Sequence, residues 1–293
     1  MRKNFINNLF LTMRPKQWTK NLVIFAGIIF AQKLFTQSIF LKVLLAFFVF
    51  CLLSGVVYII NDLKDIDNDR KHPKKKFRPL ASGDLTPSLA FITIIILTPL
   101  IITSSYFLSK PFFLIASIYF LLMIFYTFYL KNIVILDVLT IALGFLLRAV
   151  AGVVVISVSL SPWLVICTLL LALFLALSKR RHELVLLEDN AVCHRRILEE
   201  YSPKLLDQMI SLVTASTVMA YALYTMSPET IEKFHTDKLI YTVPFVLYGI
   251  FRYLYLVYKK EQGGYPEKIF LTDLPTFLNI VLWGLTVGII IYL

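Results

Sequence analysis

Apolar runs of roughly 20 residues recur along almost the whole chain and constrain its fold more than any other feature. A helix that crosses a bilayer needs about 20 apolar residues. The chain has 293 residues, of which 58% are hydrophobic and only 16% are charged, whereas a soluble domain carries about 25% charged residues. Too few polar side chains remain to cover a water-soluble globule. The sequence therefore predicts an all-α integral membrane protein with residues 1–293 as a single transmembrane domain. The nine expected spans are 19–35, 39–60, 87–108, 112–130, 134–157, 162–178, 206–226, 239–258 and 273–292.

The loops between these spans differ in their content of lysine and arginine. Cytoplasmic loops of membrane proteins carry an excess of both residues. If the N-terminus is cytoplasmic, most of the lysines and arginines outside the spans fall on the cytoplasmic side, and few fall on the other side. The sequence thus predicts a cytoplasmic N-terminus and an external C-terminus. The net charge of +11 follows largely from this loop bias, so it does not indicate nucleic acid as a partner.

An acidic cluster follows the second expected span. Asp62, Asp65 and Asp69 fall at i, i+3 and i+7, which places them on one face if the helix continues. Three carboxylates this close repel one another unless a cation lies between them, and hard oxygen ligands suit Mg²⁺. A basic run that includes Lys74 and Arg78 comes directly afterwards. Acids for a metal beside bases for phosphate oxygens predict a site for a magnesium diphosphate on the cytoplasmic face.

A second polar loop begins where the sixth expected span ends. On a continuing helix Glu183 lies at i+4 from Lys179 and at i+3 from Arg180, so ion pairs can form along the helix surface. One interpretation is a plain surface ion pair. The other is a second wall of a phosphate pocket, in which Glu183 holds a base in place or assists the metal.

Ionisable residues inside expected spans are functional hypotheses by default. Arg148 lies deep in the fifth span and is expected to pair with an acid or to face a water-filled cavity. Tyr126 and Lys131 end the fourth span on the side of the acidic cluster, where Lys131 can reach a phosphate. For Arg252 in the eighth span, a pocket role and a structural role both stay open.

The N-terminal residues form a short amphipathic patch before the first expected span. Its apolar members are Phe5, Ile6, Leu9 and Phe10. Such a patch is typical of a segment that lies in the membrane interface.

The acidic cluster resembles a known motif. The pattern Asn61-Asp62-x-x-Asp65-x-x-x-Asp69, continued by Arg70, His72-Pro73, Arg78-Pro79 and Ser82-Gly83, is similar to the first signature of the UbiA superfamily of intramembrane prenyltransferases. Members of that superfamily have nine transmembrane helices and two cytoplasmic polar motifs, in the loops after helices two and six. The resemblance implies that Asp62, Asp65 and Asp69 are the catalytic and metal-binding residues and that Mg²⁺ is the cofactor.

Other segments resemble one branch of this superfamily, the polyprenyl-phosphate (decaprenyl-phosphate) phosphoribosyltransferases. Residues 14–21 are similar to the entry motif of the branch, and residues 248–254 and the loop to Asp273 also resemble it. Residues 179–183 match its Lys-Arg-x-x-Glu motif, where typical prenyltransferases carry Asp-x-x-x-Asp. Tyr265 departs from the branch, which has Asp before Pro266, and this puts the role of the last loop in doubt.

The resemblance implies a Mg²⁺-dependent transfer of 5-phosphoribose from 5-phosphoribosyl 1-diphosphate to a polyprenyl phosphate in the bilayer, with release of diphosphate. It also implies a multi-pass protein of a bacterial cytoplasmic (inner) membrane that serves cell-envelope biosynthesis. The substrate-binding residues expected on this basis are Gln17, Lys20, Asn61, Lys74, Arg78, Tyr126, Lys131, Lys179, Arg180 and Glu183.

Two alternatives stay open from the sequence. The first is a prenyltransferase that moves a polyprenyl group from its diphosphate to an aromatic acceptor, which the missing second pair of aspartates disfavours. The second is a transporter or lipid-binding protein without chemistry, which the concentration of polar residues at one membrane face disfavours. The oligomeric state is also open, and a homo-oligomer is one option.

Overall fold

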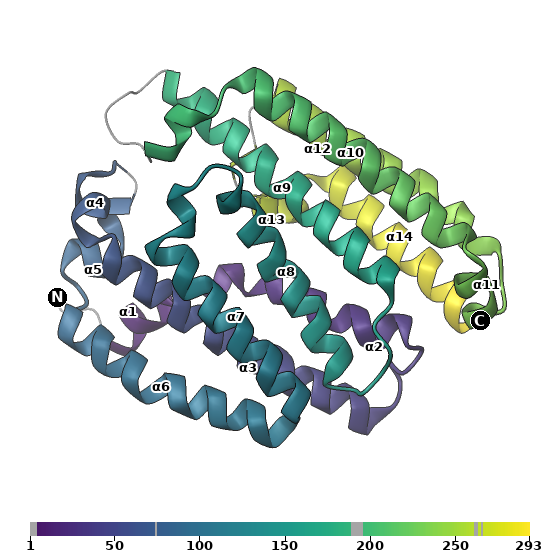
Figure 1. Ribbon diagram of the computed structural model, residues 1–293, viewed down its shortest axis with the longest axis horizontal. Helices are drawn as coiled ribbons and strands as arrows, with labels where there is room; N and C mark the ends of the chain where they lie inside the picture. The colour runs from purple at the N-terminus through teal and green to yellow at the C-terminus, as the bar shows by residue number, and fades with distance from the viewer. Residues whose placement is uncertain (1–4, 74, 189–195, 261–262, 265) are drawn as a thin grey trace. The chain divides into compact units, whose positions relative to one another are not determined.

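A computed structural model describes residues 5–73, 75–188, 196–260, 263–264 and 266–293, and in these ranges every regular element is a helix (Figure 1). The chain divides into two compact units, Met1–Leu160 and Ser161–Leu293, which are described separately below. The expectation of an all-α protein is confirmed.

The first unit is built around four long helices. Phe50 of α3 lies against two rings of α7, with ring centroids 5.7 Å from Phe112 and 5.2 Å from Tyr119, so α3 and α7 share the centre of the core. Short helices precede α3 and connect α3 to α6 and α7 to α8, whereas only Ser109 separates α6 from α7. In order, the elements are α1 (Phe5–Thr12), η1 (Pro15–Phe25), α2 (Ala26–Phe30), α3 (Gln37–Lys64), α4 (Ile66–Lys71), η2 (Lys75–Phe77), α5 (Pro79–Ser82), α6 (Pro87–Leu108), α7 (Lys110–Phe128), η3 (Leu130–Asn132) and α8 (Leu136–Val154).

The second unit contains four further long helices. The ring of Phe174 on α9 lies 5.3 Å from that of Tyr253 on α12, and α9 also packs along α10. In order, the elements are α9 (Pro162–Glu188), η4 (Arg196–Glu200), α10 (Pro203–Met226), α11 (Pro228–Phe234), η5 (Lys238–Thr242), α12 (Val243–Lys259), α13 (Pro266–Thr272) and α14 (Leu274–Tyr292).

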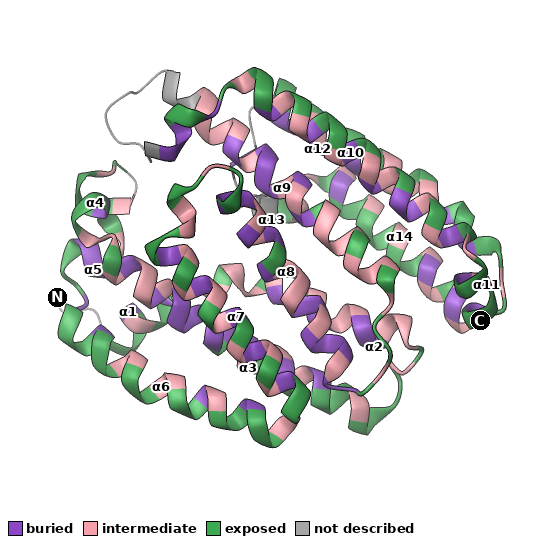
Figure 2. Ribbon diagram, viewed as in Figure 1, coloured by how far each residue is buried: buried purple, intermediate pink, exposed green. Residues whose placement is uncertain are grey.

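Eight stretches among the described residues are helical, long enough and apolar enough to cross a membrane. They correspond to the last eight of the nine spans expected from the sequence, and the third agrees residue for residue with α6. Only 17% of the apolar window of α6 is buried within the protein, so most of its side chains need lipid rather than water around them. Figure 2 shows such exposed residues along α6.

The first expected span, 19–35, does not form one long helix. Its residues belong to η1, a tight 3₁₀ helix, and to α2, which has only five residues. The segment then turns at Gln32, whose φ of 56° lies in the left-handed region. The count of nine spans and the orientation of the termini are therefore not confirmed and stay predictions.

The η1 segment lies extremely close to α8. A Cβ atom added to Gly152 would come within 1.9 Å of the carbonyl oxygen of Ile24, so only glycine permits this approach. Gly27 makes the reciprocal contact, since its added Cβ would lie 2.9 Å from the carbonyl of Gly152. The two glycines hold the entry segment against the core of the first unit.

Candidate active site

The acidic cluster lies where α3 gives way to α4. The α3 helix ends at Lys64, and Asp65 adopts φ −102° and ψ 11° before α4 begins at Ile66. The single continuous helical face expected for the three aspartates is thus broken in its middle. The break is small, because the amide of Asp69 still donates to the carbonyl oxygen of Asp65 at 2.8 Å. It is sufficient to give Asp65 different partners from those of Asp62 and Asp69.

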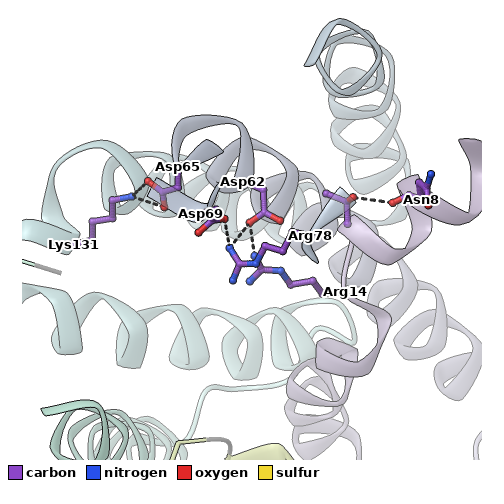
Figure 3. Close-up of polar contacts among 8 residues, drawn as sticks. Asn8, Arg14, Asp62, Asp65, Asp69, Arg78 and Lys131 are labelled. Carbon is purple, nitrogen blue, oxygen red and sulfur yellow. Dashed lines mark hydrogen bonds and ion pairs between the residues drawn. The ribbon is translucent and has the colours of Figure 1, made fainter. Parts of the chain in front are cut away.

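Asp62 and Asp69 share one arginine. Nη1 of Arg78 lies 3.1 Å from Oδ1 of Asp62 and 2.5 Å from Oδ2 of Asp69 (Figure 3). Oδ1 of Asp62 also accepts a hydrogen bond from Arg14, whose guanidinium stacks over the ring of Tyr58 at 4.8 Å. Asp62 is only 2% exposed, and a buried carboxylate requires such partners because the loss of hydration is costly.

Asp65 has a separate partner in Lys131 of η3. The ammonium group lies 2.8 Å from Oδ1 and 3.0 Å from Oδ2 of Asp65. Figure 3 shows Asp65 directed toward Lys131, while Asp62 and Asp69 face the two arginines. In this structure the partner of Lys131 is therefore a carboxylate, and its expected contact with a phosphate stays a prediction.

The carboxylates suit a hard divalent cation in chemistry and only partly in arrangement. Asp62 and Asp69 converge on one shared cationic nitrogen of Arg78, so a cation is already held between them. Asp65 is directed elsewhere, and the described residues contain no group of three or more His, Cys, Asp or Glu side chains positioned to hold a metal. The oxygen donors therefore match the ligands that Mg²⁺ prefers, but of the three carboxylates only those of Asp62 and Asp69 are brought together in this structure.

The entry segment supplies one residue that the sequence reasoning overlooked. Arg14 caps η1 in the left-handed conformation, with φ 53° and ψ 60°, and contacts Asp62. Arg14 and Asp62 are 48 positions apart, so no local spacing indicates their contact. The position of Arg14 at the start of the entry motif was the only feature of the sequence that pointed to a role. The expected ligands Gln17 and Lys20 lie on η1, where Lys20 donates to the side chain of Gln17 at 3.2 Å.

Arg148 has neutral partners inside the first unit. Its Nε donates to Oδ1 of Asn21 at 2.7 Å, its Nη2 to the hydroxyl of Tyr119 at 2.7 Å and its Nη1 to the carbonyl oxygen of Gly144 at 2.9 Å. The sequence predicted either an acidic partner or a water-filled cavity for Arg148, and in place of an acid its guanidinium has these three neutral oxygens. Asn21 also donates to Ser54 of α3 at 3.3 Å, so the network joins η1, α3, α7 and α8.

The second polar motif lies at the end of α9 in the second unit. Glu183 pairs with Arg180 at 2.5 Å and with Lys179 at 3.9 Å, as the spacing predicted. The side chain of Arg180 is only 2% exposed, which is unusual for a plain surface ion pair.

The neighbouring Arg181 faces other helices. It pairs with Asp207 of α10 at 2.5 Å, and its guanidinium lies 3.9 Å from the ring centroid of Tyr258 on α12. The hydroxyl of Tyr258 donates to the same Asp207 oxygen at 2.7 Å. Arg181 thus ties the end of α9 to two helices and fixes the backbone that carries Arg180 and Glu183.

Arg252 forms a structural link between α12 and α14. Its guanidinium makes two hydrogen bonds to Asp273, at 2.7 and 3.1 Å. Asp273 also caps α14 by accepting from the amide and the hydroxyl of Thr276. The hydrogen bonds from Arg252 are the main reason why the pKa of Asp273 is lowered to about 2.

Of the other residues singled out from the sequence, the structure describes Asn61 and Tyr126. Asn61 and Tyr126 are half-buried on α3 and α7, and the carbonyl oxygen of Asn61 accepts from the amide of Asp65. Lys74 and Tyr265 lie outside the described residues.

Known proteins resemble this chain over nearly its whole length. It is 31% identical to the decaprenyl-phosphate phosphoribosyltransferase of Corynebacterium glutamicum, over 99% of this chain and 89% of the relative. It is also 31% identical to the protein of that name from Mycolicibacterium smegmatis, over 99% of this chain and 94% of the relative. Both values exceed what chance similarity gives over such a length.

Solved structures share the fold at lower identity. A UbiA homologue from Archaeoglobus fulgidus, solved with GPP and Mg²⁺, superposes with a TM-score of 0.72 at 19% identity, covering 97% of this chain and 99% of that one. The model of the UbiA prenyltransferase family matches residues 21–281, which include the acidic cluster of the first unit and the polar motif of the second. The chain is therefore a membrane enzyme that belongs to the UbiA prenyltransferase family.

Proposed function

We propose that this enzyme transfers 5-phosphoribose from 5-phosphoribosyl 1-diphosphate to a polyprenyl phosphate held in the membrane. The observation that carries the proposal is a cluster of acids and bases. The buried carboxylates of Asp62 and Asp69 share the guanidinium of Arg78. Arg14 contacts Asp62, and Lys131 contacts the neighbouring Asp65. Acids that bind a cation, surrounded by bases that bind phosphate oxygens, form a site for a metal diphosphate. The names of the two relatives at 31% identity support the choice of phosphoribose as the group transferred.

Asp62, Asp65 and Asp69 would hold Mg²⁺, which when bound supplies charge neutralisation for the leaving diphosphate. Arg78 and Lys131 already lie at these carboxylates and would bind phosphate oxygens of the donor. Gln17, Lys20, Asn61, Lys74 and Tyr126 stay proposed substrate contacts on the basis of their sequence positions.

The second motif would bind the donor through its bases. Lys179 and Arg180 carry two positive charges beside one acid, Glu183, which holds Arg180 in place. A motif with an excess of bases suits the 5-phosphate of the donor, which a prenyl diphosphate lacks.

The transfer itself needs no general base. The bond from C1 of the ribose to the diphosphate oxygen breaks, and a new bond forms from C1 to a phosphate oxygen of the lipid. The attacking oxygen already carries negative charge, so no proton has to be removed from it, and the electron pair of the broken bond leaves with the diphosphate. The role of the protein is then to orient the two phosphates and to stabilise charge.

We also propose that residues 1–293 act as one catalytic domain in a bacterial cytoplasmic membrane. The family model spans both units, which supports a single domain. Nine spans with a cytoplasmic N-terminus and an external C-terminus would place the acidic cluster on the side where the water-soluble donor is available.

The direct test uses purified protein in detergent with radiolabelled 5-phosphoribosyl 1-diphosphate, Mg²⁺ and a polyprenyl phosphate. We expect label to enter the organic phase, EDTA to stop the transfer, and Asp62→Asn to lower the rate at least 100-fold. The matched control is Asp67→Asn, because the Asp67 side chain is 91% exposed and pairs only loosely with Arg70. Folded protein that transfers no label to lipids of several lengths would contradict the proposal.

A prenyl transfer to an aromatic acceptor is the second candidate. The observation in its favour is the fold shared with a homologue solved with GPP and Mg²⁺. The single acid in residues 179–183 disfavours it. The same preparation, given a polyprenyl diphosphate and an aromatic acid, distinguishes the two reactions by which donor is consumed.

A further inference from the structure

The short N-terminal helix α1 has its polar and apolar faces reversed relative to a helix on a soluble protein. Its large exposed side chains are Phe5, Ile6, Phe10 and Leu11, and Ile6 is 76% exposed. Two polar residues of the same helix, Asn8 and Thr12, are each only 1% exposed. The helix thus turns its polar side toward the protein and its apolar side outward.

A hydrogen bond to another segment holds α1 in this orientation. The side-chain amide of Asn8 donates to the carbonyl oxygen of Asp84, in the turn after α5, at 3.0 Å. The buried hydroxyl of Thr12 is satisfied within α1 itself, where it donates to the carbonyl oxygen of Asn8 at 2.8 Å. Rotating the helix to bury its apolar face would break the bond to Asp84, so the outward face is a stable property of the fold.

The α1 helix packs on the same small core as the start of a candidate membrane span. Leu9 packs on a small core that contains Leu85 and Ala90, where α6 begins, and α1 lies beside α5 (Figure 1). Immediately along α6 the exposed residues are Phe91 and Ile92. Because α6 requires lipid around it, we expect the exposed apolar side chains of α1, which packs on the same core, to meet the same medium.

The helix is too short to cross that medium. Eight residues give a length of about 12 Å at 1.5 Å per residue, whereas the hydrocarbon core is about 30 Å thick. Directly after it, Trp18 donates to the carbonyl oxygen of Met13 at 3.3 Å and packs edge-on against Phe10. A tryptophan next to basic residues such as Arg14 and Lys16 is typical of the boundary between lipid and water.

We infer that α1 is an in-plane amphipathic helix, with Phe5, Ile6, Phe10 and Leu11 inserted among the lipids of the leaflet next to the Asp62 cluster. This surface would contact lipid at the depth where the head groups meet the acyl chains. Asn7, which is also exposed, is a polar residue that the head-group layer accommodates. Since Arg14 follows α1 after one residue, the helix sets the depth at which the Arg14–Asp62 pair meets the aqueous side.

A nitroxide label at Ile6→Cys measures this depth in the full-length protein, with Cys51, Cys167 and Cys193 replaced and the protein in lipid nanodiscs. We expect the label to collide with oxygen at least threefold more often, relative to a water-soluble nickel chelate, than a matched label at Asp67→Cys on α4. Asp67 is the control because it is a highly exposed side chain near the same cluster.

A water-like collision ratio at position 6, equal to that at position 67, would overturn the inference. Dipolar broadening between labels would also overturn it, because the apolar face would then be covered by a second copy of the chain. If the cysteine-free protein does not fold, the test uses the fluorescence of an Ile6→Trp variant in which the native cysteines are kept. Lipids that carry bromine near the ester carbonyl of their acyl chains should quench a larger fraction of the tryptophan fluorescence in this variant than in the parent protein. Equal fractions would contradict the in-plane position.

Discussion

The Nε atom of Arg148 donates a hydrogen bond of 2.7 Å to Oδ1 of Asn21, and this bond joins α8 to η1 inside the first unit. The two residues are 127 positions apart, and both are almost fully buried. A buried charge without an acidic partner remains tolerable only when neutral acceptors satisfy its donors. The bond therefore couples the entry segment, which carries Arg14, to the helical core.

Substituting Asn21 by Leu should destabilise the protein and displace η1. The change removes the acceptor of Arg148 and leaves a charged donor buried, which costs more than the roughly 1–3 kcal/mol of an unsatisfied neutral group. We expect a lower midpoint of thermal unfolding in detergent, and Asn21→Asp should recover most of the loss because its carboxylate accepts the same bond. Thr19→Leu on the same segment is a matched control, since the Thr19 hydroxyl bonds only to a local carbonyl. An unchanged midpoint for Asn21→Leu would contradict the structural role of the bond.

Gly152→Ala should be among the most disruptive small substitutions in the chain. The added Cβ would lie 1.9 Å from the carbonyl oxygen of Ile24, so α8 and η1 would have to separate. We expect lower thermal stability together with a lower transfer rate, because η1 also carries Arg14 at its start. Gly288→Ala provides the comparison, since a Cβ there meets nothing within 4 Å and alanine favours the helix. Equal stability of the two variants would contradict the close packing of η1.

Hydropathy was sufficient to predict eight of the expected spans, because each is a long apolar run whose length is set by the bilayer. The first span differed because the residues from Pro15 to Phe30 wind into a 3₁₀ helix followed by a single short α-helix, and this segment packs directly against Gly152. Hydropathy does not register contacts of this kind.

The sequence indicated which residue types make up the candidate site, whose roles stay predictions, but not how these residues pair. Asp62, Asp65 and Asp69 do cluster with cations, as the charge pattern indicated. Helical periodicity placed them on one face, but a local break at Asp65 separates them, and nothing in the spacing signals the break. Arg14 and Asn21 were missed as partners because their contacts, with Asp62 and Arg148, join segments far apart in the sequence.

Lys131 and Asp65 should behave as a coupled pair in the transfer reaction. Lys131→Gln leaves Asp65 without its partner, and we expect about a tenfold or greater loss of kcat/KM, expressed mainly in the KM of the donor. Residues that contact each other give non-additive effects, so the Asp65→Asn/Lys131→Gln double variant should lose little more than the worse single variant. The measurement is the transfer assay at varied donor concentration.

The control for this cycle is the pair Asp67 and Arg70. Their charged atoms are 3.6 Å apart and both side chains are exposed, at 91% and 56%, so water screens the interaction. We expect each single variant there, and the double variant, to retain nearly full activity. Strict additivity of the Lys131 and Asp65 effects would show that the two residues act independently.

The link between Arg252 and Asp273 should weaken in acid. The pKa of Asp273 is lowered to about 2, below the usual value of about 3.9, chiefly because Arg252 hydrogen-bonds to the ionised carboxylate. A lowered pKa in the folded state adds stability that is fully present above the unfolded value and is lost as pH falls through the folded value, here between about pH 4 and pH 2. Asp273→Asn keeps a good cap for α14 and removes this titration. We therefore expect its unfolding midpoint to be lower than that of the parent at pH 6, with the difference shrinking toward pH 2.5. A difference that stays constant over this range, measured by intrinsic fluorescence in detergent, would show that the carboxylate does not titrate as the contact requires.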